Sequence, residues 1–217
     1  MALESSKRAL DPTERVSEVL FGLIMVLTFT GSLSVATAGH AEVREMLVGA
    51  LGCNLAWGVI DALLYLMGVL AEKGRGLAVW HAVRETTDSG RGQKLIADAL
   101  PPLAASVLEP PELEAMRRRL AEAPEPPPRP RLGGEEWRAA LAVFLLVVVS
   151  TLPVAIPFVV LRDAGRALRL SNGIAVAMLF VCGYTMGRLT RYHPWATGVG
   201  MVLLGSALVA MTMALGG

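Results

Sequence analysis

Two acidic residues lie within long apolar stretches of the sequence. Glu18 is the single charged residue of residues 17–38, and Asp61 is the single charged residue of residues 46–71. A charge at membrane depth is energetically costly, so we expect these carboxyl groups to face other helices or a hydrated path, or to be protonated. A carboxylate binds a metal ion only in its deprotonated form, so such a residue can exchange a proton for a metal ion.

Asp61 belongs to a polar face of its predicted helix. Residues spaced alternately four and three apart share one face of a helix, and this face contains Asn54, Gly58, Asp61, Tyr65, Gly68 and Glu72. The first apolar stretch has a similar face, which contains Glu18, Gly22, Met25, Phe29 and Ser32. If the two helices form an antiparallel hairpin, Met25 is expected at the depth of Asp61 and Glu18 nearer the cytoplasm.

The polar groups on these two faces suit a transition metal. Carboxylate and amide oxygens together with a thioether favour an ion of intermediate softness over magnesium. We therefore predict a metal site formed by Glu18, Met25, Asn54 and Asp61. A polar path along these two faces would include Glu18, Met25, Asn54, Asp61, Tyr65 and Glu72. In the alternative interpretation, the polar groups form hydrogen bonds between helices. Met25 then fills apolar space, and Glu18 lies at the membrane surface.

The charges of the chain are segregated from its apolar residues. Hydrophobic residues make up 53% of the sequence and the mean hydropathy is +0.52, although 18% of the residues are charged. Because backbone groups find no water in the bilayer core, apolar stretches of membrane length form helices. The sequence predicts an all-α polytopic membrane protein with five transmembrane helices, at residues 17–38, 46–71, 140–161, 170–187 and 194–217.

Three parts of the chain follow from these spans. Residues 1–71 contain an N-terminal segment and the first two spans, and residues 137–217 contain the last three. Residues 72–136 form a small helical insert, with predicted helices at 72–86, 93–108 and 109–120. A proline-rich connector at residues 124–130 returns the chain to the membrane.

Lysine and arginine residues predict the orientation. The N-terminus and the insert carry most of them, which places both in the cytoplasm and the C-terminus outside. We therefore expect an integral protein of the cytoplasmic (inner) membrane. Arg162, Arg166 and Arg169 oppose this orientation. The first span also resembles a secretory signal peptide that ends at residues 36–38, but a predicted helix start at Pro12 favours a retained helix.

Several other residues are candidates for secondary roles. Pro153 and Pro157 lie in the third span, where each removes a backbone donor and favours a helix kink. In the insert, His81 with Glu85 and Glu112 with Met116 have i, i+4 spacing, so these four are possible cytoplasmic metal ligands, although the same spacing is found in ordinary surface pairs. Cys53 and Cys182 lie in apolar spans, which is typical of small buried residues.

The order of these elements resembles the vacuolar iron transporter family. In that family, two helices, a cytoplasmic insert and three further helices follow one another. Residues 152–158 (Leu-Pro-Val-Ala-Ile-Pro-Phe) are similar to the proline motif of the family's third span, and residues 179–190 are similar to the end of its fourth span. Residues 198–205 resemble part of its fifth span.

The resemblance implies a homodimeric transporter rather than an enzyme. Such a protein moves Fe2+ or Mn2+ out of the cytoplasm in exchange for protons, and it holds no permanently bound cofactor. Its partners are the lipid bilayer, the transported ions and a second copy of the chain, and no nucleic acid. Residues 17–20 (Ser-Glu-Val-Leu) stand in place of the family's Asp-Gly-Leu motif, so Glu18 replaces an aspartate. The family's insert is rich in Glu and Met, whereas residues 72–136 are basic.

Two other function classes remain open at this point. A membrane scaffold would use the basic residues Arg117, Arg118 and Arg119 to dock a cytoplasmic partner or anionic lipid. An intramembrane enzyme would need a paired nucleophile and base, a zinc-binding His-Glu motif or a phosphate-binding glycine loop, and the sequence contains none of these patterns.

Overall fold

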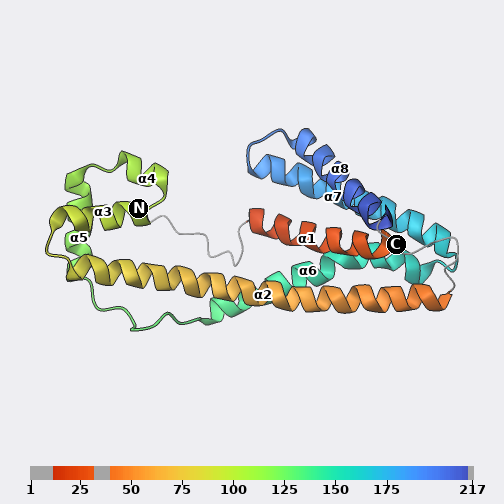
Figure 1. Ribbon diagram of the computed structural model, residues 1–217, viewed down its shortest axis with the longest axis horizontal. Coiled ribbons are helices and arrows are strands. Elements are labelled where there is room, and N and C mark those ends of the chain that lie inside the picture. The colour runs from red at the N-terminus through yellow and green to blue at the C-terminus, as the bar shows by residue number, and fades with distance from the viewer. Residues whose placement is uncertain (1–11, 32–39, 215–217) are drawn as a thin grey trace. The chain divides into compact units, whose positions relative to one another are not determined.

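The computed structural model of the protein describes residues 12–31 and 40–214 (Figure 1). Every regular element in these ranges is a helix, which confirms the predicted all-α class. The helices are α1 (Pro12–Gly31), α2 (His40–Glu85), α3 (Ser89–Ala99), α4 (Pro102–Val107), α5 (Pro110–Glu122), α6 (Gly134–Val160), α7 (Ala164–Leu189) and α8 (Pro194–Ala214). The first of them begins at Pro12, the predicted start, because proline fits the first turn of a helix.

Three of the described helices are long and apolar enough to cross a membrane. They are residues Leu47–Glu85 of α2, all of α6 and all of α7. In α8, the apolar segment Pro194–Leu208 is shorter than these three. Residues 32–39, which include Ser32 and the predicted cleavage site, lie outside the described residues, as does the side chain of Phe29. The structure thus supports an integral membrane protein, and the count of five spans stays a prediction.

The chain forms two compact units, and helix α2 contributes to both. The first unit contains residues 1–65 and 137–217, and the second contains residues 66–136. Helix α2 runs for 46 residues without a break, so the second predicted span and the first predicted insert helix are one element. Polarity changes near Glu72, but no proline lies between His40 and Glu85 to end the helix.

A buried cluster in the first unit joins α1 to α6 and α7. Helix α1 contributes four residues with helical spacing, which are Leu20, Leu23, Val26 and Leu27. Val154 of α6 and Ala175 and Leu179 of α7 complete the cluster. Met178 and Cys182 pack against this cluster, as expected for apolar packing rather than for exposed ligands. Large side chains elsewhere on α2 and α6 are apolar and exposed, including Leu55, Leu63 and Leu145, which is the composition that a lipid-facing surface requires.

Glycines allow the helices of the first unit to approach closely. A Cβ atom at Gly183 of α7 would lie 2.6 Å from the carbonyl oxygen of Thr197 in α8. These two helices form a tight hairpin (Figure 1). A Cβ atom at Gly22 of α1 would lie 2.8 Å from Oγ of Ser150 and 3.1 Å from the carbonyl oxygen of Val147, both in α6. Gly22 therefore sets how closely α6 approaches α1.

Helix α6 continues through both of its prolines. Pro153 and Pro157 cannot donate to the carbonyl groups four residues earlier, at Val149 and Pro153. The hydroxyl groups of Ser150 and Thr151 donate instead to the carbonyl oxygens of Val147 and Val148, at 3.0 and 2.8 Å. These hydroxyl groups thus bond within the turn before the prolines, and the predicted kink at the prolines stays a prediction.

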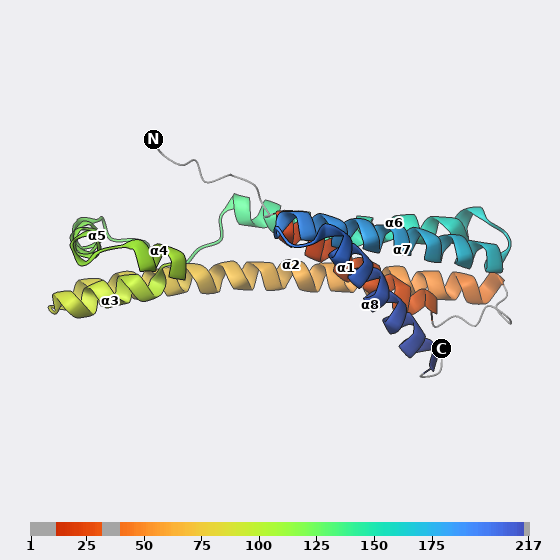
Figure 2. The same cartoon turned by 90° about the horizontal axis from the view of Figure 1, so that it is seen from above.

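The second unit is held together by helix caps and ion pairs. Asp88 caps α3 by accepting from the backbone N–H groups of Gly90 and Arg91, and Glu109 and Glu112 form a capping box at the start of α5. Helix α3 packs against α4 and α5 (Figure 2). Lys73 of α2 forms an ion pair with Glu136 at 2.5 Å, which ties the end of the connector to that helix.

The close approach at Gly22 gives a stability prediction. Gly22→Ala places a methyl group against Ser150 and Val147, so we expect overpacking to destabilise the protein by about 1–3 kcal/mol. The control is Gly52→Ala, because a Cβ atom there meets no atom within 4 Å. Thermal melts in detergent should show a lower Tm for Gly22→Ala and an unchanged or higher Tm for Gly52→Ala. Equal Tm values for the two variants would contradict the close approach.

Candidate metal-ion site

Helices α1 and α2 pack in an antiparallel arrangement with a single register. Three pairs of side chains define it, and these are Glu18 with Asp61, Phe21 with Trp57, and Met25 with Cys53. As the residue number rises along α1, the number of its partner in α2 falls by nearly the same amount. The predicted hairpin is therefore present within the first unit.

The Glu18 and Asp61 carboxyl groups lie within hydrogen-bonding distance of each other. Both side chains are half-buried, and Oδ2 of Asp61 is buried without a hydrogen-bond partner among the described residues. Two carboxylates at such a short distance repel each other, and a hydrogen bond between them requires a proton on one of them. The pair thus needs a cation, which is either a proton or a metal ion.

Met25 lies farther along the hairpin, beside Cys53. The Cys53 thiol donates to Sδ of Met25 at an S–S distance of 3.9 Å. Met25 is seven residues from Glu18, or about 10 Å along α1. The predicted register, which brought Met25 to the depth of Asp61, is therefore wrong. The edge-to-face contact of Phe21 with Trp57, at 5.4 Å between ring centroids, lies between the two pairs and sets the register.

Asn54 is fully buried and holds α2 against α6. Its Nδ2 donates to Oγ1 of Thr151 at 2.6 Å and approaches the carbonyl oxygens of Val147 and Val148 at 3.3 and 3.4 Å. The Thr151 hydroxyl donates to the Val148 carbonyl group, so it can only accept from Asn54. This fixes the orientation of the amide, and it leaves the buried Oδ1 of Asn54 without a partner among the described residues.

The four predicted metal ligands are thus divided among three contacts. Glu18 meets Asp61, Met25 meets Cys53, and Asn54 meets Thr151. Tyr65 is half-buried one turn beyond Asp61, at the end of the first unit. The described residues contain no group of three or more His, Cys, Asp or Glu side chains that could hold a metal ion. Within one chain, the carboxyl pair is the strongest candidate site.

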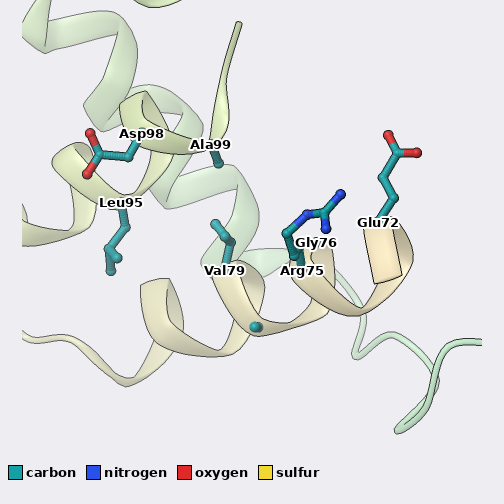
Figure 3. Close-up of a pocket in the computed structure, with 8 residues that line it drawn as sticks. Glu72, Arg75, Gly76, Val79, Leu95, Asp98 and Ala99 are labelled. Atoms are coloured by element: carbon teal, nitrogen blue, oxygen red, sulfur yellow. The ribbon is translucent and has the colours of Figure 1, made fainter. Parts of the chain in front are cut away.

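Glu72 belongs to the second unit, where it lines a cavity of about 710 Å³. Its walls come from α2 and α3, and Figure 3 shows Glu72 and Asp98 on opposite sides of it. Arg75 stands beside Glu72, while Val79 and Leu95 supply apolar wall. This cavity combines two carboxylates with a guanidinium group, so it is not a simple cation site.

The four predicted metal ligands of the insert do not form one cluster, and two of them make other contacts. His81 packs edge-to-face on Trp80, with ring centroids 4.9 Å apart, and Glu85 is exposed. Glu112 accepts from the backbone N–H of Glu109 at 2.9 Å, so it caps α5. Met116 is half-buried on the same helix. Metal binding by these four residues stays a prediction.

Sequence comparison identifies the family of the chain. The sequence model of the VIT family matches residues 81–217, well over half of the chain. The chain belongs to the VIT family. This confirms the resemblance to vacuolar iron transporters, and it indicates membrane metal-ion transport. Among curated proteins, no match to the chain is found. The VIT-family match begins after Asp61, so it does not include the carboxyl pair.

Sequence reasoning missed two residues of the site region. The sequence indicates that Cys53 is a small buried residue, but Cys53 contacts Met25. Thr151 has no predicted role, but it accepts a hydrogen bond from Asn54. Cys53 can be recognised as a partner of Met25 only once the register of the hairpin is known. No spacing within α6 predicts that Thr151 faces Asn54.

An ion-pair network in the second unit gives a pH prediction. Arg117 donates to both carboxylate oxygens of Glu114 at 2.8 and 2.9 Å, and Ser89, Gln93 and Arg118 also donate to this group. These bonds, that of Arg117 foremost, hold the pKa of Glu114 well below its ordinary value of 4.5. A lowered pKa means that the contribution to stability is present above pH 4.5 and is lost as the pH falls below it.

We therefore expect α3 and α5 of the full-length protein to lose protection on acidification. Hydrogen exchange, corrected for the intrinsic pH dependence, should be slow in both helices at pH 7 and should become progressively faster as the pH falls from about 4.5 to about 2. Glu114→Gln should already exchange fast at pH 7. Glu122→Gln, an exposed position on the same helix, should behave as wild type. Wild-type protection for Glu114→Gln at pH 7 would show that the network does not hold these helices.

Proposed function

We propose that this VIT-family protein exports Fe2+ or Mn2+ from the cytoplasm in exchange for protons. The observation that carries the proposal is the contact between the Glu18 and Asp61 carboxyl groups in an apolar helical hairpin. A buried carboxylate pair must be neutralised, and a proton and a divalent cation are alternative ways to do so. The two ions therefore compete for one site, which is the requirement for coupled exchange.

The exchange has a defined order in this account. On the cytoplasmic side the pair gives up its proton and binds the metal ion between the two carboxylates. On the other side, protonation of the pair weakens metal binding and releases the ion. The protonated pair then returns. Asp61 is the principal proton carrier, since its Oδ2 has no partner among the described residues.

The small number of ligands supports a homodimer. Six oxygen ligands are typical of Mn2+ sites, whereas one chain brings two carboxylates together here. In a symmetric dimer each contact surface is used twice, so apposed hairpins would supply four carboxylates. We propose that the pathway lies between two copies of α1 and α2, with the N-terminus in the cytoplasm of the inner membrane and Glu72 near the cytoplasmic opening.

The scaffold alternative has less support. Its docking residues include Arg117 and Arg118, and both form ion pairs with Glu114 of their own helix. A side chain held in this way is less available to a partner. The ion pairs of Arg117 and Arg118 with Glu114 therefore favour a structural role in the second unit over a docking role.

Transport by purified protein in liposomes tests the proposal. Asp61→Asn keeps the size of the side chain but removes the charge that binds the metal, so we expect uptake of Mn2+ and Fe2+ driven by a pH gradient to fall more than about tenfold. Glu18→Gln should have a similar effect. The matched control is Glu45→Gln, an exposed acid on the same helix as Asp61, which should transport normally. Wild-type uptake by Asp61→Asn would exclude Asp61 from the mechanism.

A further inference from the structure

The hairpin of α1 and α2 contains a second contact between potential metal ligands, and both of them are sulfur atoms. The Cys53 thiol and the Met25 thioether lie 3.9 Å apart. Both side chains are half-buried. Thiolate and thioether groups are soft ligands, and they select soft metal ions such as Cu(I) over Mn2+ or Fe2+.

The distance between the sulfur atoms matches that of two ligands on one metal ion. With a metal–sulfur bond of about 2.3 Å, two sulfur ligands at a tetrahedral angle lie about 3.8 Å apart, and at a trigonal angle about 4.0 Å. The observed 3.9 Å falls between these values. A metal ion could therefore replace the thiol proton with little movement of either helix.

This sulfur pair is separate from the carboxyl pair. Along α1 seven residues separate Met25 from Glu18, and along α2 eight residues separate Cys53 from Asp61, which correspond to about 10 and 12 Å. A single ion cannot bridge that distance. The same hairpin therefore presents oxygen ligands at one level and sulfur ligands at another.

We propose that Cys53 and Met25 form a second metal site, which binds a monovalent thiophilic ion of the Cu(I) class. Binding replaces the proton of the Cys53 thiol by a metal–sulfur bond and releases that proton, while Met25 adds its thioether without a change of charge. The site goes beyond the proposed exchange of divalent ions, because its ligands and its level in the hairpin differ.

Binding of Ag+ to the full-length protein in detergent tests this site. Ag+ is a soft monovalent ion that needs no reductant, and titration calorimetry measures its affinity directly. We expect one tight site in the wild type, and the affinity should fall more than about tenfold in Cys53→Ser and in Met25→Leu. Competition with a Cu(I) chelator under anaerobic conditions should rank the Cu(I) affinities of the wild type and the variants in the same order.

The chain offers a matched control pair of cysteine and methionine. Met178 and Cys182 lie one turn apart on α7 and pack against the buried cluster, so Cys182→Ser and Met178→Leu should retain wild-type Ag+ affinity. Asp61→Asn should also bind Ag+ normally, which separates a failure of this site from a failure of the proposed transport. Unchanged Ag+ affinity in Cys53→Ser, or an equal loss in Cys182→Ser, would overturn the proposal.

Discussion

The repulsion between two carboxyl groups is the constraint on which this account depends. Glu18 and Asp61 face each other across the α1–α2 hairpin, in a region where water is scarce and an unpaired charge is costly. Such a pair is stable only with a cation bound. The fold brings the two acids together, and in the proposed function a proton and a metal ion compete for this pair.

The surrounding helices hold the acids in this position. Gly22 lets α6 approach α1, and Gly58 lets it approach α2, where a Cβ atom would lie 3.1 Å from Phe144. Asn54 then fastens α2 to Thr151 of α6 by a short hydrogen bond. The VIT-family match covers residues 81–217, which include α3 to α8, and it begins after α1 and the apolar part of α2. Glu18 and Asp61 therefore lie outside the matched residues, whereas α6, which packs against both of their helices, lies within them.

The sequence predicted the helices well because apolar length and proline position determine them locally. The start at Pro12 and the unusual position of Asp61 follow from single residues and their neighbours. The register of the hairpin could not be predicted in this way. It depends on the contact of Phe21 with Trp57 and on the space beside Gly22, and both involve residues far apart in the sequence. For the same reason Cys53 was not recognised as a partner of Met25, and the continuity of α2 past Glu72 was hidden by a change in polarity.

Cysteine cross-linking tests the register of the hairpin most directly. In a background with Cys53→Ser and Cys182→Ser, the pair Glu18→Cys with Asp61→Cys is compared with the pair Met25→Cys with Asp61→Cys. A protease site inserted in residues 32–39 separates the two helices after oxidation, so only cross-linked fragments stay joined. The account predicts rapid cross-linking of positions 18 and 61 and little between 25 and 61. Faster cross-linking of positions 25 and 61 would contradict it.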